Sequence, residues 1–369
     1  MKKRLIVLCD GTWNRADAPA LTNVCKLRDA VDEGEGAAVR QHVHYEPGVG
    51  TRRWERFRGG AFGVGLSRNV RNCYEFLVER YEPGDELFLF GFSRGAFTAR
   101  SLAGLVRNSG ILRREHGDIV ADAYRLYRSR KPGDAPSERS AEAFRDKYSH
   151  PDAEIMFIGV WDTVGALGVP IDGFRPPLLS RRWTFHDTTL SRFVLNAYHA
   201  ISIDERRRPF VPTMWVKKVA ADGTVEEPPE HQTVSQVWFA GVHSDVGGGY
   251  PDPSLSEIPL RWIADRARAC GLALKPDHLV VRAGSVDERK RRNGIELAPD
   301  PGGPMHDSMT LFYRVLRPLD RGLEARDGVP INASLASSVK LRCEQDRSYA
   351  APGLGEWLTR GREITDVGP

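Results

Sequence analysis

The sequence predicts an α/β fold in which a mainly parallel sheet is flanked by helices. Two observations support this class. The main apolar runs are continuous rather than alternating, which is typical of strands buried on both faces. Each run ends abruptly in a polar or glycine-rich turn, and helix-compatible stretches lie between the runs. The chain has 369 residues, 41% of them hydrophobic, and is long enough to bury such a core.

Four apolar runs are expected to form strands, in the order Leu5–Cys9, Glu86–Phe90, Ile155–Trp161 and Val237–Val242. Three other segments are expected to form helices, namely Ser67–Tyr81, Ala96–Asn108 and Ser256–Cys270. In an open parallel sheet, ligands bind beyond the carboxyl ends of the strands. A functional site is therefore expected in the turns that follow the four runs.

The chain is expected to form a single domain over residues 1–369 that carries additions. Two insertions, at about 110–150 and 168–193, are expected to form helices and loops over the carboxyl ends of the strands. The part from about 285 to 369 is expected to be rich in loops.

Charge and cysteine content exclude several classes of protein. The 53 basic and 49 acidic residues leave a net charge of +4, which is too small to indicate a nucleic-acid partner. The five cysteines show neither close pairing nor metal-type spacing, so we expect no disulfide scaffold, no metal site and no cofactor. No window approaches the ~18 apolar residues of a membrane span, and the first apolar run is too short for a signal peptide. A cytoplasmic location is expected, with any membrane contact peripheral.

The second predicted strand runs directly into a G-x-S-x-G motif, Gly91 to Gly95. A strand before this motif and a helix after it are the context of a nucleophile elbow, a strained turn that exposes a serine above the sheet. Ser93 is then the nucleophile. Gly91 and Gly95 are required because side chains there would strike neighbouring backbone. The amide of Arg94, at the start of the helix, would face a developing oxyanion.

A serine nucleophile needs a base that is itself oriented by an acid. Asp162 follows the third predicted strand and His243 follows the fourth, which places both at the same sheet edge as Ser93. His306 is the main competitor for the base. Asp204 and Asp245 compete for the acid, but Asp204 suits an ion pair or cap, and Asp245 can support the turn after His243.

The turn after the first strand, Asp10-Gly11-Thr12, also lies at this edge. In serine hydrolases of this architecture the second oxyanion donor comes from a loop beside the nucleophile strand. The amides of Gly11 and Thr12 are therefore candidate donors. Asp10 is interpreted as a residue that braces the loop.

The motifs taken together resemble those of an uncharacterised α/β-hydrolase domain family of bacteria and fungi that includes type VI secretion lipase effectors. The matching blocks run from Cys9 to Tyr250 in the family's order: C-D-G-T-W-N, Y-E-P-G-V-G-T, G-F-S-R-G-A, G-V-W-D-T-V-G, I-D-E-R-R-R-P-F-V-P and V-W-F-A-G-V-H-S-D-V-G-G-G-Y. The resemblance implies an α/β-hydrolase-like fold, a triad of Ser93, Asp162 and His243, and phospholipase activity. For an effector it also implies non-classical export and a secretion-apparatus or immunity partner.

The sequence therefore predicts a serine esterase or lipase that cleaves carboxylic esters, including lipid acyl esters, through an acyl-enzyme. Two alternatives stay open. One is a metal-dependent phosphoesterase in which Asp10, Asp162, His243 and Asp245 converge as ligands at the strand ends. The other is a catalytically inactive binding module that keeps the hydrolase fold.

Overall fold

The computed structural model describes most of the chain. The described residues are 2–12, 14, 17–34, 39–49, 61–129, 131–151, 153–165, 190–220, 222–281, 295–310, 313–314, 318–324 and 328–368. The expected insertion at 168–193 falls largely outside these residues.

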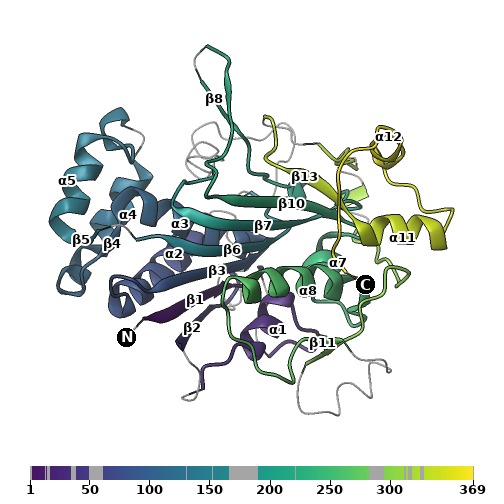
Figure 1. Ribbon diagram of the computed structural model, residues 1–369, viewed down its shortest axis with the longest axis horizontal. Helices are drawn as coiled ribbons and strands as arrows, with labels where there is room; N and C mark the ends of the chain where they lie inside the picture. The colour runs from purple at the N-terminus through teal and green to yellow at the C-terminus, as the bar shows by residue number, and fades with distance from the viewer. Residues whose placement is uncertain are drawn as a thin grey trace.

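The centre of the molecule is an eight-stranded sheet in which each pair of neighbours is parallel (Figure 1). Its strands, from one edge to the other, are β14 (Ile364–Thr365), β13 (Ala333–Ala336), β10 (Thr233–Phe239), β7 (Val194–Ser202), β6 (Ile155–Trp161), β3 (Glu86–Phe92), β1 (Lys3–Cys9) and β2 (Arg40–Glu46). The four predicted strands are β1, β3, β6 and β10, so the predicted fold class is confirmed.

Helices bury both faces of the sheet. One face is covered by α1 (Asn23–Ala30), α7 (His243–Gly247) and α8 (Ser254–Ala269), and the other by α2 (Ala61–Arg80) and α3 (Arg94–Ser109). The side chains of β1 alternate between the two faces. Ile6 and Leu8 pack on the face covered by α1, α7 and α8, and Leu5 and Val7 pack on the face covered by α2 and α3. Burial on both faces explains why the runs are continuously apolar.

The first expected insertion is helical, but it lies away from the carboxyl ends of the strands. It contains β4 (Ile111–Leu112), η2 (Arg114–Ile119), α4 (Val120–Arg128), η3 (Pro132–Asp134), α5 (Arg139–Tyr148) and β5 (Ser149–His150). Helix α3 runs back from the carboxyl edge to the amino edge of the sheet, and the insertion begins where α3 ends (Figure 1). The segment therefore packs beside α2 and α3 rather than over the expected site.

The C-terminal part is more ordered than expected from its loop-rich sequence. After β11 (Val280–Val281) and β12 (Glu296–Leu297) come β13, α11 (Ser337–Gln345), α12 (Leu354–Thr359) and β14. Leu335 on β13 and Trp357 on α12 are both buried in the core. This part therefore completes one edge of the main sheet.

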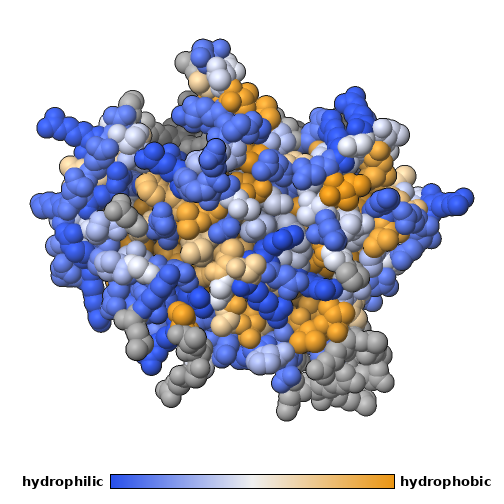
Figure 2. Space-filling view, in the orientation of Figure 1, coloured by the Kyte–Doolittle hydropathy of each residue, from blue (hydrophilic) through white to orange (hydrophobic). Residues whose placement is uncertain are grey.

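The remaining elements are short, and no described helix could cross a membrane. They are η4 (Arg208–Phe210) and the hairpin of β8 (Lys218–Val219) and β9 (Val225–Glu226). Within the described ranges, no helix combines the length and the apolar character that a bilayer span requires. Figure 2 shows one face of the molecule, on which hydrophobic residues are interspersed among hydrophilic ones.

Candidate active site

Ser93 lies at the sharp turn between β3 and α3. Its backbone has φ 58° and ψ −120°, a conformation that side-chain-bearing residues rarely adopt. Its amide donates a hydrogen bond to the carbonyl oxygen of Trp161 on the adjacent strand at 3.0 Å. Such a strained strand-to-helix turn is the geometry of a nucleophile elbow.

The two glycines of the motif are required by close backbone contacts. A Cβ atom on Gly91 would lie 2.5 Å from the carbonyl oxygen of Gly95. A Cβ on Gly95 would lie 2.1 Å from the carbonyl oxygen of Cys9. Both distances are far below van der Waals contact, so α3 can approach β1 and β3 only when these positions lack a side chain.

His243 and Asp162 meet Ser93 at the carboxyl edge of the sheet. The Nε2 atom of His243 lies 2.8 Å from Ser93 Oγ, and its Nδ1 atom lies 2.5 Å from Asp162 Oδ2. The imidazole contacts two aromatic rings, with centroids 4.7 Å away for Phe92 and 4.9 Å away for Phe210. All three predicted triad residues are buried. The arrangement is a serine, a base and an acid in continuous hydrogen-bond contact.

Asp162 is held as a carboxylate by a buried arginine that the sequence analysis did not identify. Arg321 donates to Asp162 Oδ1 at 2.6 Å and to Oδ2 at 3.0 Å, and the amide of Ser202 donates to Oδ1 at 3.1 Å. Burial alone would raise the pKa of Asp162, but the positive charge of Arg321 and the contact with His243 hold it well below its usual range. Asp162 is therefore ionised at neutral pH.

His243 is neutral in the resting protein. Burial lowers its pKa below the usual 6.5, and the hydrogen bond to Asp162 offsets this effect only in part. Because Nδ1 faces the carboxylate, the proton on the ring is assigned to Nδ1, which leaves the Nε2 lone pair toward Ser93 Oγ. The imidazole is thus in the form that can accept the serine proton.

The first turn adjoins Ser93. A Cβ on Gly11 would lie 3.3 Å from the Cβ of Ser93, so the two backbones are in close contact. The Gly11 amide already donates to Asp10 Oδ1 at 2.7 Å. Thr12 is buried, and its Oγ1 has no hydrogen-bond partner within the described part of the chain.

Asp10 has several donors of its own. Its Oδ2 accepts hydrogen bonds from Tyr45 Oη at 2.8 Å, Thr22 Oγ1 at 2.9 Å and Cys25 Sγ at 3.1 Å. Burial raises its pKa, and these hydrogen bonds oppose the increase. The side chain therefore links the first turn to α1 and β2.

His306, the competing base, is paired with a different carboxylate. Its Nδ1 lies 2.6 Å from Asp245 Oδ1, and its ring stacks on Tyr250 with centroids 3.9 Å apart. Asp245 Oδ2 also accepts from the amide of Val242, the residue before His243, at 3.0 Å. Burial raises the pKa of Asp245. Asp245 and His306 thus lie behind the turn that carries His243.

Two acids on the loop after β7 also support this turn. Asp204 Oδ2 accepts from the Gly241 amide at 2.7 Å and from Tyr349 Oη at 2.9 Å. Glu205 is buried and accepts from the His243 amide at 3.3 Å, and it also forms an ion pair with Arg207 at 2.7 Å. Only Asp204 was expected here from the sequence. The run of four charged residues that follows it, which begins with Glu205, was the one signal for the second acid.

Arg94 has its amide at the start of α3, beside Ser93, and its side chain among other charged and aromatic groups. Burial lowers the pKa of its guanidinium to about 10, Tyr313 opposes the decrease, and Arg207 adds to it. Arg207 in turn lies over the ring of Phe210 at 3.7 Å. Two guanidinium groups therefore lie close to each other near the triad, one of them paired with Glu205.

The four residues that would bind the metal of a phosphoesterase do not form one cluster. Asp162 pairs with His243, Asp245 pairs with His306, and Asp10 binds residues of α1 and β2. Among the described residues, the only group of metal-type donors within 4.8 Å of one another lies elsewhere, on β2 and α2. The geometry favours the hydrolase arrangement.

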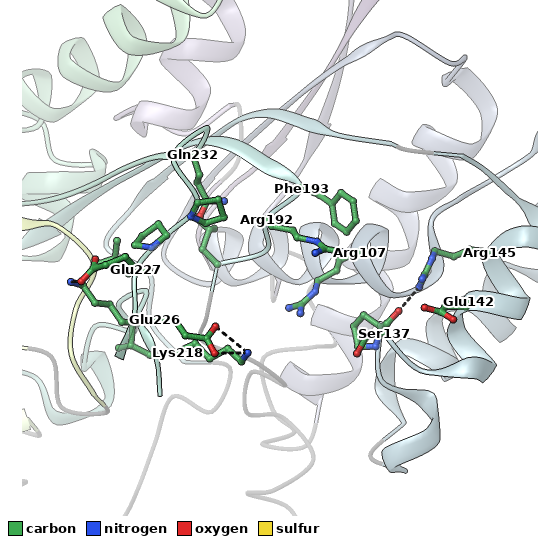
Figure 3. Close-up of a pocket in the computed structure, with 17 residues that line it drawn as sticks. Arg107, Ser137, Glu142, Arg145, Arg192, Phe193, Lys218, Glu226, Glu227 and Gln232 are labelled. Atoms are coloured by element: carbon green, nitrogen blue, oxygen red, sulfur yellow. Dashed lines mark hydrogen bonds and ion pairs between the residues drawn. The ribbon is translucent and has the colours of Figure 1, made fainter. Parts of the chain in front are cut away.

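A hollow of about 400 Å³ lies at the opposite edge of the sheet (Figure 3). Phe193 and Gln232, which line it, directly precede β7 and β10, so this hollow is at the amino ends of the strands. Arg107 and Arg145 from the other wall also face it. It is not part of the site around Ser93.

Comparison with known proteins identifies relatives of the chain. Residues 3–266 match the family model for the type VI secretion phospholipase effector Tle1-like catalytic domain. An uncharacterised protein of Saccharomyces cerevisiae is 30% identical over 229 residues, which are 56% of this chain and 32% of the yeast protein. The chain thus spans about a third of the length of this relative.

Two solved structures are also similar. The crystal structure of an uncharacterised protein from Pseudomonas aeruginosa matches with a TM-score of 0.40 and 18% identity, over 74% of this chain and 46% of that one. The structure of the Tle1 effector bound to the VgrG spike of the type 6 secretion system matches with a TM-score of 0.47 and 14% identity, over 75% of this chain and 74% of that one.

Proposed function

Because the chain belongs to the family of Tle1-like type VI secretion phospholipase effector catalytic domains, we propose that it hydrolyses the acyl esters of phospholipids with Ser93 as the nucleophile. The observation that carries the proposal is the hydrogen-bonded chain from Ser93 Oγ through His243 to Asp162, at 2.8 Å and 2.5 Å. This order of contacts on a nucleophile elbow is the arrangement that activates a serine.

In the proposed reaction, His243 Nε2 takes the proton of Ser93 while Oγ attacks the ester carbonyl carbon. The resulting imidazolium is stabilised by ionised Asp162, which also fixes the tautomer. His243 then protonates the departing alcohol oxygen, and an acyl-enzyme remains on Ser93. A water molecule, deprotonated by His243, hydrolyses the acyl-enzyme and releases the fatty acid.

The oxyanion is proposed to be bound by the amides of Arg94 and Thr12. The Arg94 amide lies at the start of α3, where the first backbone N–H groups have no partner within the helix. Of the two candidates in the first turn, Thr12 is favoured because the Gly11 amide already donates to Asp10. The buried Thr12 hydroxyl adds a second donor on the same residue. Removal of one such donor typically lowers kcat by about 10²–10³.

The phospholipid preference rests on the family and on local charge. Arg94 and Arg207 interact electrostatically beside the triad, and a guanidinium is well suited to bind a lipid phosphate. By the same family membership, we include delivery by a secretion apparatus in the proposal; the solved Tle1 effector is bound to a VgrG spike. The proposal also includes a partner protein that confers immunity to the effector.

The central test is covalent labelling with a fluorophosphonate, which reacts with activated serines. We expect wild-type protein to be labelled, Ser93→Ala to be unlabelled, and Ser348→Ala, which changes an exposed serine in the C-terminal part, to be labelled normally. Phospholipid vesicles should yield free fatty acid with the wild type and not with Ser93→Ala.

Two outcomes would contradict the proposal. A wild-type protein that is folded but neither labelled nor active on any ester would favour the inactive binding module. Phosphodiester cleavage that survives Ser93→Ala and stops when divalent metal is removed would favour the metal-dependent phosphoesterase.

A further inference from the structure

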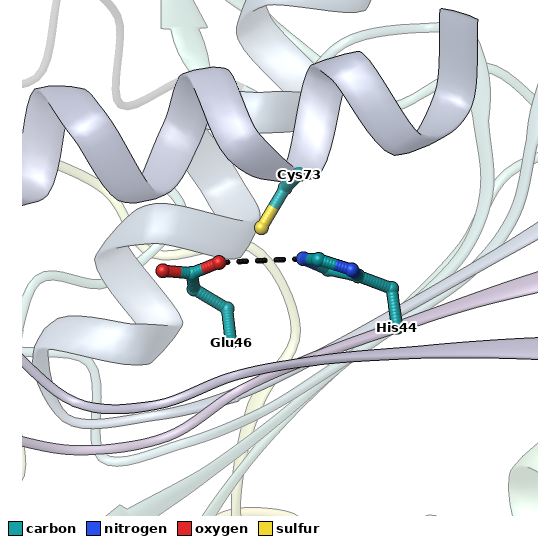
Figure 4. A group of neighbouring side chains, drawn as sticks. All are labelled: His44, Glu46 and Cys73. Atoms are coloured by element: carbon teal, nitrogen blue, oxygen red, sulfur yellow. Dashed lines mark hydrogen bonds and ion pairs between the residues drawn. The ribbon is translucent and has the colours of Figure 1, made fainter. Parts of the chain in front are cut away.

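A second group of chemically reactive side chains lies between the edge strand β2 and helix α2, away from the triad. His44 and Glu46 are two residues apart on β2, so both side chains point to the face that α2 covers. Cys73 points down from α2 toward them, as Figure 4 shows. One nitrogen, one carboxylate oxygen and the sulfur lie within 4.8 Å of one another.

A fourth donor comes from β1. Cys9 is in register with Glu46 on the neighbouring parallel strand, so the two side chains point to the same face. Its Sγ lies 3.7 Å from Cys73 Sγ. Helix α2 thus brings the Cys73 thiol within 4.8 Å of His44 and Glu46, and the Cys9 thiol of β1 adjoins Cys73.

Two separations in the cluster agree with the edges of a tetrahedral site. Zinc binds sulfur at about 2.3 Å and nitrogen or oxygen at about 2.0–2.1 Å, which gives tetrahedral edges of about 3.8 Å between sulfurs and about 3.3 Å between nitrogen and oxygen. Here the Cys9 and Cys73 sulfurs are 3.7 Å apart. His44 Nε2 and Glu46 Oε2 are 3.3 Å apart. His44, Glu46 and Cys73 lie within 4.8 Å of one another as placed, and Cys9, which touches Cys73, would turn toward the metal to complete the site.

From this geometry we propose that His44, Glu46, Cys73 and Cys9 form a structural zinc site. Thiolate and imidazole ligands select zinc over magnesium and calcium, which prefer oxygen ligands only. The thiolates and the carboxylate supply the negative charge that a divalent cation needs. This site goes beyond the proposed function, because it would exist whether or not Ser93 is a nucleophile.

The surroundings of the four donors suit a bound cation. Cys9, Cys73 and Glu46 are buried, so a cation bound between them would be shielded from solvent. Asn72 Nδ2 donates to Glu46 at 3.3 Å, which orients the carboxylate from outside the cluster.

His44 provides a route from solvent. Its side chain is 25% exposed at the sheet edge, whereas that of Glu46 is 8% exposed. The imidazole is stacked on Phe76 with ring centroids 5.1 Å apart, so its orientation is already set. A metal ion can therefore reach the cluster past His44, whose ring is already oriented, without unfolding of the core.

The location implies a structural role. Cys9 and Glu46 are the last residues of β1 and β2, and the amide of Asp10 donates to the Glu46 carbonyl at 2.9 Å. A zinc ion bound to both side chains would fix the two strand ends from which the first turn starts. It would therefore brace the loop that carries Thr12 without contacting the reaction.

The test measures metal rather than activity. Purified full-length protein, saturated with zinc and freed of excess by gel filtration, should contain one zinc per chain by elemental analysis. Replacement by Co²⁺ should give the intense thiolate-to-cobalt charge-transfer absorption of a sulfur-ligated site. Zinc should also raise the melting temperature of the wild type, because it binds the folded chain.

Matched variants locate the metal. Cys73→Ser and Glu46→Gln should each lose the bound zinc or weaken binding by at least about tenfold, and should lose the zinc-dependent increase in melting temperature. His42→Gln, on the same strand, and Cys270→Ser, on the far side of the sheet, should keep one zinc per chain. If Cys73→Ser fails to fold, the wild-type zinc content and cobalt spectrum still decide.

The proposal is overturned if folded wild-type protein binds less than a tenth of an equivalent of zinc, or if its cobalt form lacks the charge-transfer absorption. It is also overturned if metal content is the same in wild type, Cys73→Ser and Glu46→Gln. A disulfide between Cys9 and Cys73 in protein purified under air, with no zinc uptake after reduction, would likewise exclude it. Loss of fluorophosphonate labelling in Ser93→Ala bears only on the proposed function.

Discussion

At the residue scale, Arg321 decides whether Asp162 can serve as an acid partner. Both guanidinium NH groups contact the carboxylate, and the two side chains are only 3% and 0% exposed. A buried carboxylate that loses its cation becomes costly to keep ionised. Arg321 is therefore a positioning residue for His243, acting through Asp162.

We predict that Arg321→Met lowers the free energy of unfolding by about 3–5 kcal/mol at pH 7, because Asp162 is left buried without its counter-ion. Urea denaturation would measure the change. Arg314→Met is the matched control, since the Arg314–Asp307 pair is 62% exposed at both ends and such pairs contribute about 0–1 kcal/mol. Equal losses in the two variants would contradict the assignment.

The same pair has a predictable dependence on pH. In the wild type the pKa of Asp162 is depressed, so its stabilising contribution is present above the unfolded value of about 3.9 and is lost as the pH falls toward the folded pKa. In Arg321→Met, burial raises this pKa, and acidification relieves the penalty. The stability gap between the two proteins should therefore be large at pH 7 and narrow toward pH 4.

His243 should set the acid limb of the activity profile. Burial lowers its pKa below 6.5, so kcat/KM on a soluble ester should rise with pH to a plateau that is reached near pH 7. Asp162→Asn should lower kcat by about 10⁴, as in other serine triads, because the tautomer is no longer fixed. An acid limb centred well above pH 7 would argue against His243 as the base.

The meeting of Ser93, Asp162 and His243 could be predicted from sequence because each directly follows a continuous apolar strand. Parallel strands bring such positions to one edge, whatever their separation along the chain. Arg321 could not be predicted, since it belongs to a loop with no periodic pattern and acts only through a contact 159 residues away in the chain. The same holds for Glu205, whose neighbour Asp204 was the more conspicuous acid.

At the scale of elements, the strands that were not predicted from the sequence have weak hydrophobic patterns. β2 reads Arg-Gln-His-Val-His-Tyr-Glu, which is polar because it forms the sheet edge. β13 and β14 have four and two residues, too few to show any period. β7 mixes polar and small residues within a nine-residue strand. Helix α2 begins at Ala61, six residues before the expected start at Ser67.

The close packing of α3 against β1 can be tested by adding a side chain at Gly95. Gly95→Ala would put a Cβ 2.1 Å from the Cys9 carbonyl oxygen, so α3 must move and Ser93 with it. We expect a loss of several kcal/mol in unfolding free energy and no fluorophosphonate labelling. Gly355→Ala, in α12 with no atom within 4 Å of the added Cβ, should be neutral or stabilising by about 0.5–1 kcal/mol. Similar melting temperatures for the two variants would contradict this packing.

At the scale of the whole molecule, the site depends on more of the chain than the family match covers. The matched region ends at residue 266, whereas Arg321 and the strands β13 and β14 follow it. Leu335 on β13 pairs with the strand that leads to His243. The C-terminal part thus completes the sheet that carries the candidate site.

We predict that a chain ending at Val281 is unlabelled by fluorophosphonate and aggregates more readily than the full chain, because β10 becomes an exposed edge strand. Labelling and light scattering measure the two effects. Arg321→Met in the full chain separates these two effects, because it should abolish labelling without exposing the edge of β10. A shortened chain that stayed monomeric and was labelled normally would show that the last strands are dispensable.

The position of Arg321 in the chain also affects the order in which the site is assembled during translation. A nascent chain emerges with the segments of Ser93, Asp162 and His243 first, and Arg321, the cation that keeps Asp162 ionised, comes after all three. Domains form as their segments leave the ribosome. Until residue 321 has docked, the partly synthesised polypeptide holds the proposed nucleophile and base beside a carboxylate that lacks its cation. In the proposed mechanism, the triad is therefore complete only after residue 321 has been synthesised.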